Sequence, residues 1–211
     1  MAVTVDATGT AVVGDTNTVL TFNNLTITAS GTALLAYLTF FQATPAPTSV
    51  AATWNSVALT QITTVTGATG QIAQLWGLAS PTTGNHTLSV SWTNTAFATV
   101  DAMSFKGTAS TFATIFKNAA TNTGSSATAS VSVTVSAGDF GAGCFSLDAG
   151  AVLSTNQTQF YVDNANSVCG GNYGTATGTF SGTLDATRSW AAVGCDIAAA
   201  VTDTLMAALM M

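Results

Sequence analysis

Residues 75–92 read LWGLASPTTGNHTLSVSW, and their pattern points to the fold class. Pro81 and Gly84 interrupt the stretch, because proline cannot donate to a strand ladder and glycine favours turns. Beyond them, Leu88, Val90 and Trp92 alternate with polar residues, which is the period of a half-buried strand. The sequence therefore predicts a β-hairpin that belongs to the scaffold, with one face in a core and His86 beside the turn.

The composition favours strands along the whole chain. Of its 211 residues, 47 % are hydrophobic and only 6 % are charged, against roughly 25 % in an ordinary domain. Glutamate is absent, and the basic residues are Lys106, Lys117 and Arg188, so the residues that populate exposed helix faces are scarce. Threonine and valine are abundant, and their branched Cβ suits a pleated strand. We therefore expect an all-β protein.

Candidate strands recur every 8–12 residues or so with turn signals between them, which is typical of an antiparallel sandwich or barrel. Residues 33–43 are apolar on both faces and predict a central strand, and Asn55-Ser56 predicts a short turn between two strands. Residues 108–129 predict a weak strand plus a loop, and residues 154–174 an irregular, exposed excursion. No linker and no strong internal repeat are evident, so we expect one domain over 1–201, followed by a short apolar tail over 202–211.

The charge excludes several classes of partner. A net charge of −6 argues against binding to nucleic acid or to an anionic membrane, since both require clustered Lys and Arg. No apolar run approaches the roughly 20 residues of a membrane-spanning helix. The first residues lack the features of a signal peptide, so we expect synthesis and folding in the cytosol. The low charge indicates either a surface covered in an assembly or one whose hydroxyls and amides suffice for solubility.

Few residues are suited to catalysis. A nucleophile triad would have to use His86, the one histidine, and no nucleophile elbow surrounds any serine. We find no cofactor-binding motif and no metal-ligand cluster, so we expect neither an enzyme nor a cofactor. Cys144, Cys169 and Cys195 form an odd set without a CxxC pair, which indicates buried thiols or a disulfide closed late.

The aromatic residues allow a binding role. Four tryptophans, Trp54, Trp76, Trp92 and Trp190, suit either a sugar-stacking platform or core packing, and core packing is favoured because each lies in a strand. Tyr161 and Tyr173 lie in the polar excursion and are the better candidates for exposed contacts.

The order of several motifs carries a further indication. Along the chain follow ALLAYLTFF, SVAATWNSVALTQI, AQLWGLASPTTGNHTLSVSW, ATVDAMSFKG, SVTVSAGDFGAG and SWAAVGCDI. This succession, over residues 18–198, resembles a family of mostly uncharacterised jelly-roll-like β-sandwich domains of bacteriophage and bacterial surface proteins. The matching positions are Trp54-Asn55 with Leu59, Leu75-Trp76, Pro81 to Gly84, and Trp190, with Ser56 where the family has glycine. The resemblance implies a single antiparallel β-sandwich of jelly-roll type.

The resemblance also implies a role. We expect a non-enzymatic structural protein of a bacteriophage particle, most simply a capsid decoration protein that bridges capsid subunits on the outer shell of the virion. Its partners would be the major capsid protein and further copies of itself, as a trimer, with neither nucleic acid nor membrane. The expected partner-binding residues are Leu205, Leu209, Met210 and Met211, because exposed apolar tails mark interfaces. The alternative for this tail is a C-terminal turn packed on the core. The alternative is a carbohydrate- or receptor-binding module of a tail fibre or cell-surface protein.

Overall fold

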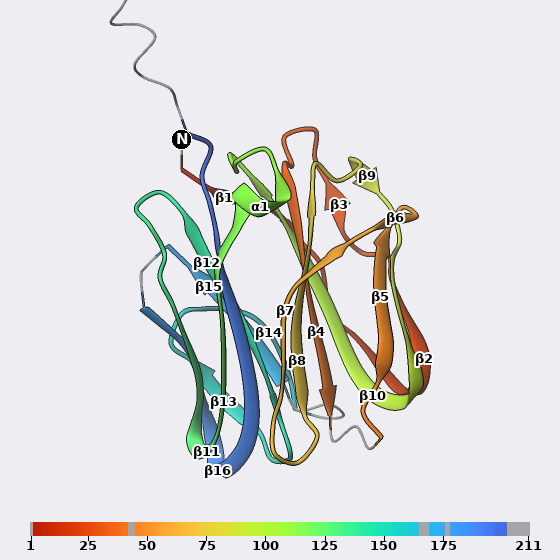
Figure 1. Cartoon of the computed structure of the whole chain (residues 1–211), viewed down its shortest axis with the longest axis vertical. Coiled ribbons are helices and arrows are strands. Elements are labelled where there is room, and N and C mark those ends of the chain that lie inside the picture. The colour runs from red at the N-terminus through yellow and green to blue at the C-terminus, as the bar shows by residue number, and fades with distance from the viewer. Residues whose placement is uncertain (1, 42–44, 165–168, 176–177, 202–211) are drawn as a thin grey trace, which may run out of the picture.

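The computed structural model describes the chain except residues 1, 42–44, 165–168, 176–177 and 202–211, and only the backbone at 15–17 and 95. The described residues form antiparallel strands and one helical turn (Figure 1). The elements are β1 (Thr4–Thr8), β2 (Val12–Phe22), β3 (Thr26–Ile27), β4 (Ala33–Phe41), β5 (Thr48–Trp54), β6 (Val57–Ala58), β7 (Thr60–Thr66), β8 (Ile72–Ala79), β9 (Gly84–Asn85), β10 (Leu88–Lys106), α1 (Phe112–Ile115), β11 (Phe116–Val133), β12 (Phe140–Leu147), β13 (Val152–Thr155), β14 (Thr158–Asp163), β15 (Cys169–Gly174) and β16 (Gly178–Ile197).

The first half of the chain forms one sheet that curls over itself. Its order is β6-β5-β10-β4-β8-β7, with β1 and β2 along the other edge of β10. The long strand β10 changes direction near Asn94, which has a positive φ of 66°. Residues 88–93 of β10 pair with β5, whereas residues 97–105 pair with β4, and Figure 1 shows the strand turning back at the foot of the molecule. The bend therefore places β5 and β4 in two facing layers.

The central strand β4 is buried on both faces, which confirms the predicted central strand over residues 33–41. Residues 42 and 43 of that prediction lie outside the described residues. Leu34, Leu38 and Phe40 pack into the core inside the curled sheet, and each such side chain stabilises the fold by about 1.5–3 kcal/mol. Leu35 and Tyr37, on the opposite face, pack into a second core. The predicted turn at Asn55-Ser56 is confirmed as well, by the positive φ of both residues between β5 and β6.

The predicted hairpin over residues 75–92 is wrong in its pairing. Both strands exist, as β8 and as the start of β10, but β4 lies between them in the sheet. The connection runs across the end of the sheet, where the indole Nε1 of Trp54 donates a hydrogen bond of 2.8 Å to the carbonyl of Thr82. Alternation identifies a strand but contains no information on its neighbour, so only long-range contacts decide the pairing.

The second half forms a six-stranded sheet of order β11-β16-β12-β15-β14, with β13 beside β16. β11 and β16 pair along their whole length, with a shift between Ser126 and Thr128, and a third core lies inside their bend. Residues 108–129 are therefore not a weak strand and a loop, because α1 and most of β11 occupy them. Pairing with twenty-residue β16 compensates for the low β-propensity of this Ala- and Asn-rich segment.

Both halves follow one pairing scheme, although the sequence contains no strong repeat. In the first half, β2 pairs with both arms of β10, β4 pairs with one arm and β5 with the other. In the second half, β11 pairs with both arms of β16, β12 pairs with one arm and β13 with the other. The two sheets stack through β4, β8 and β7 against β12, β16 and β11, and the second core fills the space between them. Each sheet thus encloses a core of its own, and the two sheets share the second core between them; Figure 1 shows the two sheets side by side.

The described residues of 154–174 lie mostly in strands rather than in an exposed excursion, and residues 165–168 of that prediction lie outside the described residues. β14 and β15 lie at the edge of the second sheet, and the glycines of β15 make room for aromatic rings on neighbouring strands. A Cβ at Gly170 would lie 2.8 Å from the Phe145 ring, and one at Gly171 would lie 2.6 Å from the Tyr161 ring. The glycine content that predicts a loop is therefore a consequence of close packing.

These observations confirm a nearly all-β protein of antiparallel sheets. Both sheets are open, and each comes from one half of the chain, so the specific jelly-roll type stays a proposal. The division into a domain over 1–201 and a tail over 202–211 also stays a prediction. The expected partner-binding residues Leu205, Leu209, Met210 and Met211 lie outside the described residues. In the described part of the chain, no helix is long and apolar enough to cross a membrane.

Candidate functional site

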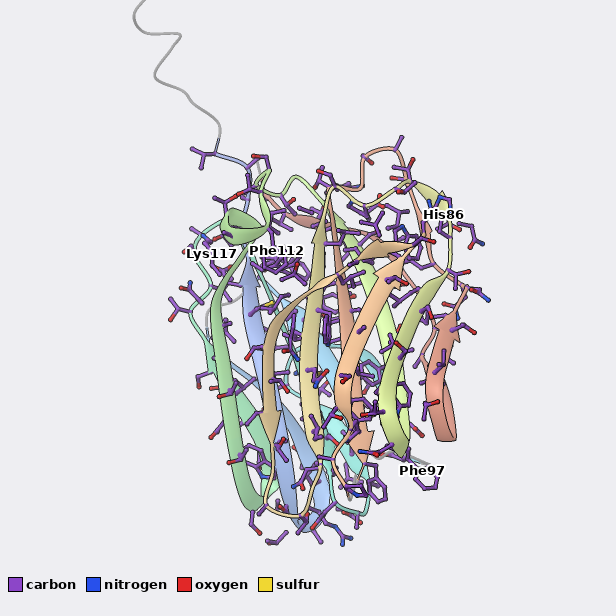
Figure 2. All side chains as sticks on the ribbon, turned by 45° about the vertical axis from the view of Figure 1, so that its right-hand side comes forward. His86, Phe97, Phe112 and Lys117 are labelled. Carbon is purple, nitrogen blue, oxygen red and sulfur yellow. The ribbon has the colours of Figure 1, made fainter. Side chains whose placement is uncertain are left out.

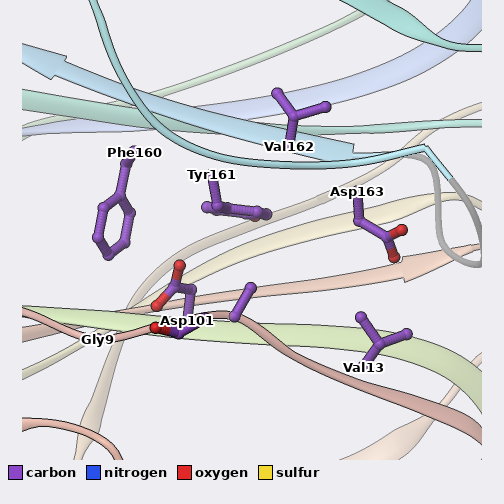
Figure 3. Close-up of a pocket in the computed structure, with 9 residues that line it drawn as sticks. Gly9, Val13, Asp101, Phe160, Tyr161, Val162 and Asp163 are labelled. Atoms are coloured by element: carbon purple, nitrogen blue, oxygen red, sulfur yellow. The ribbon is translucent and has the colours of Figure 1, made fainter.

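A pocket of about 470 Å³ lies where three segments from the two halves of the chain meet. The turn after β1 and the start of β2 form one wall, β10 forms the floor, and β14 forms the opposite wall (Figure 3). The lining residues are Gly9, Thr10, Ala11, Val13, Asp101, Phe160, Tyr161, Val162 and Asp163. A concave, partly apolar site with a few polar groups is typical of small-molecule binding, and this one requires the two sheets to be packed together.

The wall formed by the β1–β2 turn is held in place from two sides. The backbone of Thr10 both donates to Asn24 Oδ1, at 3.0 Å, and accepts from Asn24 Nδ2, at 2.8 Å. The Gly9 N–H donates to the carbonyl of Ala102 at 3.0 Å. Gly9 has to be glycine, since a Cβ there would lie 1.9 Å from the ring of Phe22. The turn is therefore a fixed wall rather than a loose loop.

A β-bulge in β14 brings two aromatic rings to the same side of the strand. Gln159 lies opposite Asn172 and Tyr161 opposite Gly171, so Phe160 is the extra residue of the bulge. The ring centroid of Phe160 lies 5.2 Å from that of Tyr37, and the ring centroid of Tyr161 lies 6.2 Å from that of Tyr37. In a regular strand these two neighbours would face opposite ways. The bulge instead places both rings over β10.

The carboxyl group of Asp101 is the central polar feature of the pocket. The residue is 1 % exposed and lies directly opposite Tyr37 in the β10–β4 ladder. Burial raises the pKa of Asp101 from 3.8 to about 7, and a hydrogen bond from the Ala102 N–H to Oδ1, at 2.7 Å, opposes this rise. Figure 3 shows the carboxyl group directed toward Phe160 and Tyr161. A carboxyl with this environment in a pocket marks a candidate functional site.

A second carboxyl group, that of Asp163, lines the same pocket from the end of β14. The hydroxyl of Thr99 donates to its Oδ2 at 3.3 Å, which links β14 to β10. Beneath the pocket, burial raises the pKa of Tyr37 and of Tyr161 well above their usual range, so both phenols are neutral at physiological pH. The site thus combines two carboxyl groups with neutral aromatic walls. The carboxyl groups can accept hydrogen bonds, and the aromatic walls can pack against an apolar face of a ligand.

Tyr161 and Tyr173 are not the exposed contacts that the sequence predicts. Tyr161 is 6 % exposed, and its hydroxyl is buried. Tyr173 is half-buried and stacks on Phe140 with ring centroids 5.4 Å apart. A polar sequence context predicted exposure, whereas neighbouring strands cover both rings.

The four tryptophans lie in the core, as predicted, and none is more than 7 % exposed. They therefore form no sugar-stacking platform. His86 lies between β9 and β10, far across the molecule from Lys117 (Figure 2). Its Nε2 lies 2.9 Å from the carbonyl oxygen of Thr83, and its ring packs edge-on against Trp54. Among the described residues, the hollow beside it is lined by His86 itself and by Thr, Asn and Ser residues, without a carboxylate.

A separate charged cluster lies where β11, the start of β12 and the end of β16 meet. Lys117 Nζ lies 3.2 Å from Asp139 Oδ2 and 3.8 Å from Asp196 Oδ2. Burial, and then the neighbouring Asp139, raises the pKa of Asp196 to about 6, while Lys117 lowers it. Asp139 Oδ1 also accepts the Ala199 N–H at 2.7 Å. This cluster ties the end of the described chain to β11, which is a structural role.

Cys144, Cys169 and Cys195 are buried in the core between the sheets, as predicted for small hydrophobic thiols. Burial raises the pKa of Cys144 and Cys195 far above the usual range, so these thiols are neutral. Within the described residues, no three His, Cys or Asp side chains are grouped closely enough to hold a metal ion.

Sequence reasoning missed this pocket because its residues come from positions near 10, 101 and 160. The one local signal is Asp101 itself, a charged residue in the apolar run ATVDAMSF. A carboxyl group in a buried strand is uncommon unless it has a partner, so Asp101 could have been singled out from the sequence. Sequence alone does not pair it with Asp163.

The chain matches no family model and no curated protein. Among solved structures, it is similar to a partial N-terminal region of an enterococcal surface protein, at 7 % identity. That similarity covers 97 % of this chain and 86 % of the other, with a TM-score of 0.26, and at this score it supports no conclusion on function. No family match ties the chain to bacteriophages, so the resemblance to their surface domains stays a proposal.

Proposed function

We propose that this chain is a non-enzymatic module that binds a carbohydrate in the pocket around Asp101. The observation that carries the proposal is the presence of two carboxyl groups and two aromatic side chains in one pocket. Sugar hydroxyls donate hydrogen bonds to carboxyl oxygens, and the C–H face of a sugar ring packs on an aromatic side chain. The volume of about 470 Å³ suits one or two sugar rings.

A glycan array with a pocket-filling variant tests this proposal. Val13 lines the pocket and is 36 % exposed, so Val13→Trp should fold and obstruct the ligand. Val19 lies on the same strand, is 49 % exposed and lies outside the pocket, so Val19→Trp is the matched control. We expect the parent and Val19→Trp to retain the same glycans and Val13→Trp to lose them. Binding by none of the three, or equal binding by all three, would overturn the proposal.

A hydrolysis assay tests the non-enzymatic part of the proposal. Two carboxyl groups beside a bound sugar are also the groups that glycosidases use as acid and base or nucleophile. We expect no release of reducing sugar from any glycan that the array identifies. Turnover that disappears in Asp101→Asn would show that the pocket is an active site.

A structural role in a bacteriophage particle is the second proposal, as a decoration protein on the outer shell of the virion. Its support is a surface with little charge, since Lys117 and Arg188 both form ion pairs and few other basic residues exist. The major capsid protein and a homotrimer are the proposed partners, through Leu205, Leu209, Met210 and Met211. Deletion of residues 202–211 should lower occupancy on purified particles in cryo-electron microscopy. Unchanged occupancy would contradict the role of the tail.

We also propose that the fold is of jelly-roll type. The orders β2-β10-β4-β8 and β2-β10-β5-β6 share the bent strands β2 and β10, which is the nested hairpin arrangement of a jelly roll. An experimental structure that kept this order while the two layers closed on each other would support the assignment. A different strand order would overturn it.

A further inference from the structure

We infer that the first sheet binds an extended, uncharged peptide segment of a partner protein as an added strand between β5 and β7. This inference goes beyond the proposed function, because it concerns a different site and a different class of ligand. Its basis is a pair of unpaired strand edges on the two sides of one pocket, together with the chemistry of the residues that line this pocket.

The pocket lies where the two ends of the curled sheet diverge. β6 pairs with Thr53 and Trp54 of β5, and the Leu59 N–H donates to the carbonyl of Ala52 at 2.8 Å. The chain then leaves β5 and pairs with β8 as β7, and Figure 1 shows β5 and β7 diverging from this point. A pocket of about 420 Å³, the wedge, lies between the two strands. It is lined by Ala46, Pro47, Thr48, Ser49 and Val50 on the β5 side, by Gln61, Thr64 and Thr66 of β7, and by Ile72 and Gln74 of β8.

Both sides of the wedge have a strand edge without a neighbouring strand. β10 pairs with one edge of β5, and along residues 49–51 no described strand pairs with the other edge. β7 is the last strand in the order of the sheet, and β8 is its one partner among the described strands. The backbone N–H and C=O groups along these two edges can therefore form ladders with an incoming strand, as in peptide recognition by β-strand addition.

Elsewhere in the protein, asparagine side chains occupy backbone groups that lack a strand partner. Asn24 both donates to and accepts from the backbone of Thr10, and Asn164 does the same with the backbone of Val152, at 3.1 and 2.8 Å. Within the described part of the chain, no side chain forms such a bond with the backbone of residues 60–66. Proteins usually protect exposed strand edges, so an edge without protection is a candidate docking site.

Gln74 supplies a buried polar group to the wedge. The residue is 6 % exposed, and its Oε1 accepts a hydrogen bond of 2.9 Å from the indole Nε1 of Trp76. Because an indole N–H can only donate, this bond fixes which end of the amide is the oxygen. The Nε2 group has no hydrogen-bond partner among the described residues, and Gln74 lines the wedge. Its N–H groups can therefore donate to a carbonyl of an inserted strand.

The lining also restricts the sequence of the inserted strand. None of the ten lining residues is charged, so a charged side chain directed inward would lose water without gaining a partner. Val50 and Ile72 pack with the core inside the curled sheet, and small apolar side chains suit the space beside them. Proline cannot donate to either ladder. The expected ligand is therefore an uncharged, proline-free segment in which small apolar and polar residues alternate.

Isothermal titration with a synthetic strand tests the inference. The probe is the acetylated and amidated peptide SVSVTVS, which has the sequence of residues 130–136 and alternates in the required way. Two further peptides carry N-methyl groups on one or the other set of alternate residues, because successive N–H groups of a strand point to opposite sides. Insertion between two edges predicts that each set weakens binding about tenfold or more, since each removes the hydrogen bonds of one side.

Three results of this titration would overturn the inference. No binding of the unmodified peptide at millimolar concentration is the first. The second is full affinity with one of the two N-methylated sets, because addition to a single exposed edge would give that result. The third concerns charge: SKSVTKS, in which two valines are replaced by lysine, should bind about tenfold more weakly or worse, and equal affinity would contradict the uncharged lining.

Two tryptophan variants test whether the peptide binds in the wedge. Thr64 is exposed and lines the wedge, so Thr64→Trp should fold and fill it. Thr60 is exposed on the same strand and does not line the wedge, so Thr60→Trp is the matched control. We expect Thr64→Trp to bind the peptide about tenfold more weakly or worse and Thr60→Trp to bind it as the parent does. Equal affinity of the two variants would overturn the inference.

Sedimentation velocity tests the other possible occupant, a second copy of this chain. We expect the parent and Thr64→Trp to have the same oligomeric state. An oligomer of the parent that Thr64→Trp dissociates would show that copies of this chain fill the wedge, and it would overturn the assignment to a partner protein.

Discussion

Replacing Asp101 by asparagine tests the electrostatics of the pocket while keeping its shape. The amide is nearly isosteric with the carboxyl group, and its oxygen can still accept the hydrogen bond from the Ala102 N–H. What the replacement removes is the group that titrates. The free energy of unfolding of the two proteins should therefore differ in a way that depends on pH.

The magnitude follows from the shift that burial imposes. The pKa of Asp101 rises from 3.8 to about 7 in the folded protein. One unit of pKa corresponds to about 1.4 kcal/mol, so the charged form costs the folded state about 4 kcal/mol relative to the unfolded chain. Because the folded pKa is the higher one, the folded state binds more protons in this window. The contribution of Asp101 to stability is therefore most favourable below about pH 4 and falls as the pH rises through about 7.

Urea unfolding of both proteins at pH 5 and pH 8 measures the effect. Groups such as Asp196 titrate in both proteins and cancel in the difference between them. We expect Asp101→Asn to gain about 2–3 kcal/mol over the parent between pH 5 and pH 8. As a control, Asp185→Asn should differ from the parent by a constant amount, because the hydrogen bond from Arg188 lowers the pKa of Asp185, which is ionised at both pH values. A constant difference for Asp101→Asn as well would refute the reasoning.

Further substitutions test other parts of the structure. Lys117→Met should lower the free energy of unfolding by about 1–3 kcal/mol at pH 8, because it leaves Asp139 and Asp196 without a cation. This loss of stability should shrink below pH 6, where Asp196 takes up a proton. A loss that is equal at pH 5 and pH 8 would contradict this reasoning. Gly171→Ala should cost about 1–3 kcal/mol in urea unfolding, because its Cβ would displace the ring of Tyr161, and an unchanged midpoint would exclude that close contact. His86→Ala should cost at most about 1 kcal/mol and leave glycan binding unchanged, since it removes an exposed hydrogen bond and one ring contact; lost binding would move the site to the hollow beside His86.

Local patterns in the sequence were sufficient for the character of the strands. Thr- and Val-rich composition predicted an all-β chain, two-sided hydrophobicity predicted the central strand over 33–43, and Asn55-Ser56 predicted a turn. The burial of the four tryptophans followed from their place in apolar strands. Each of these properties depends on residues a few positions apart, and such residues interact whatever the rest of the chain does.

Pairing and the candidate site could not be predicted in this way. β4 separates the two strands of the predicted hairpin, and β16 stabilises a segment that composition alone assigns to a weak strand and a loop. Strand neighbours are chosen by the burial of whole faces, and that choice depends on residues up to a hundred positions apart.

The sequence by itself determined that the chain forms many antiparallel strands with apolar cores, because side-chain alternation and turn residues act locally. Only the tertiary structure decided that Asp101, Phe160 and Tyr161 share a pocket. The stacking of the two sheets brings β10 to β14, and the bulge at Phe160 turns two successive rings to one side. Alternation would have placed those rings on opposite faces, and the packing around Tyr37 is what accommodates both.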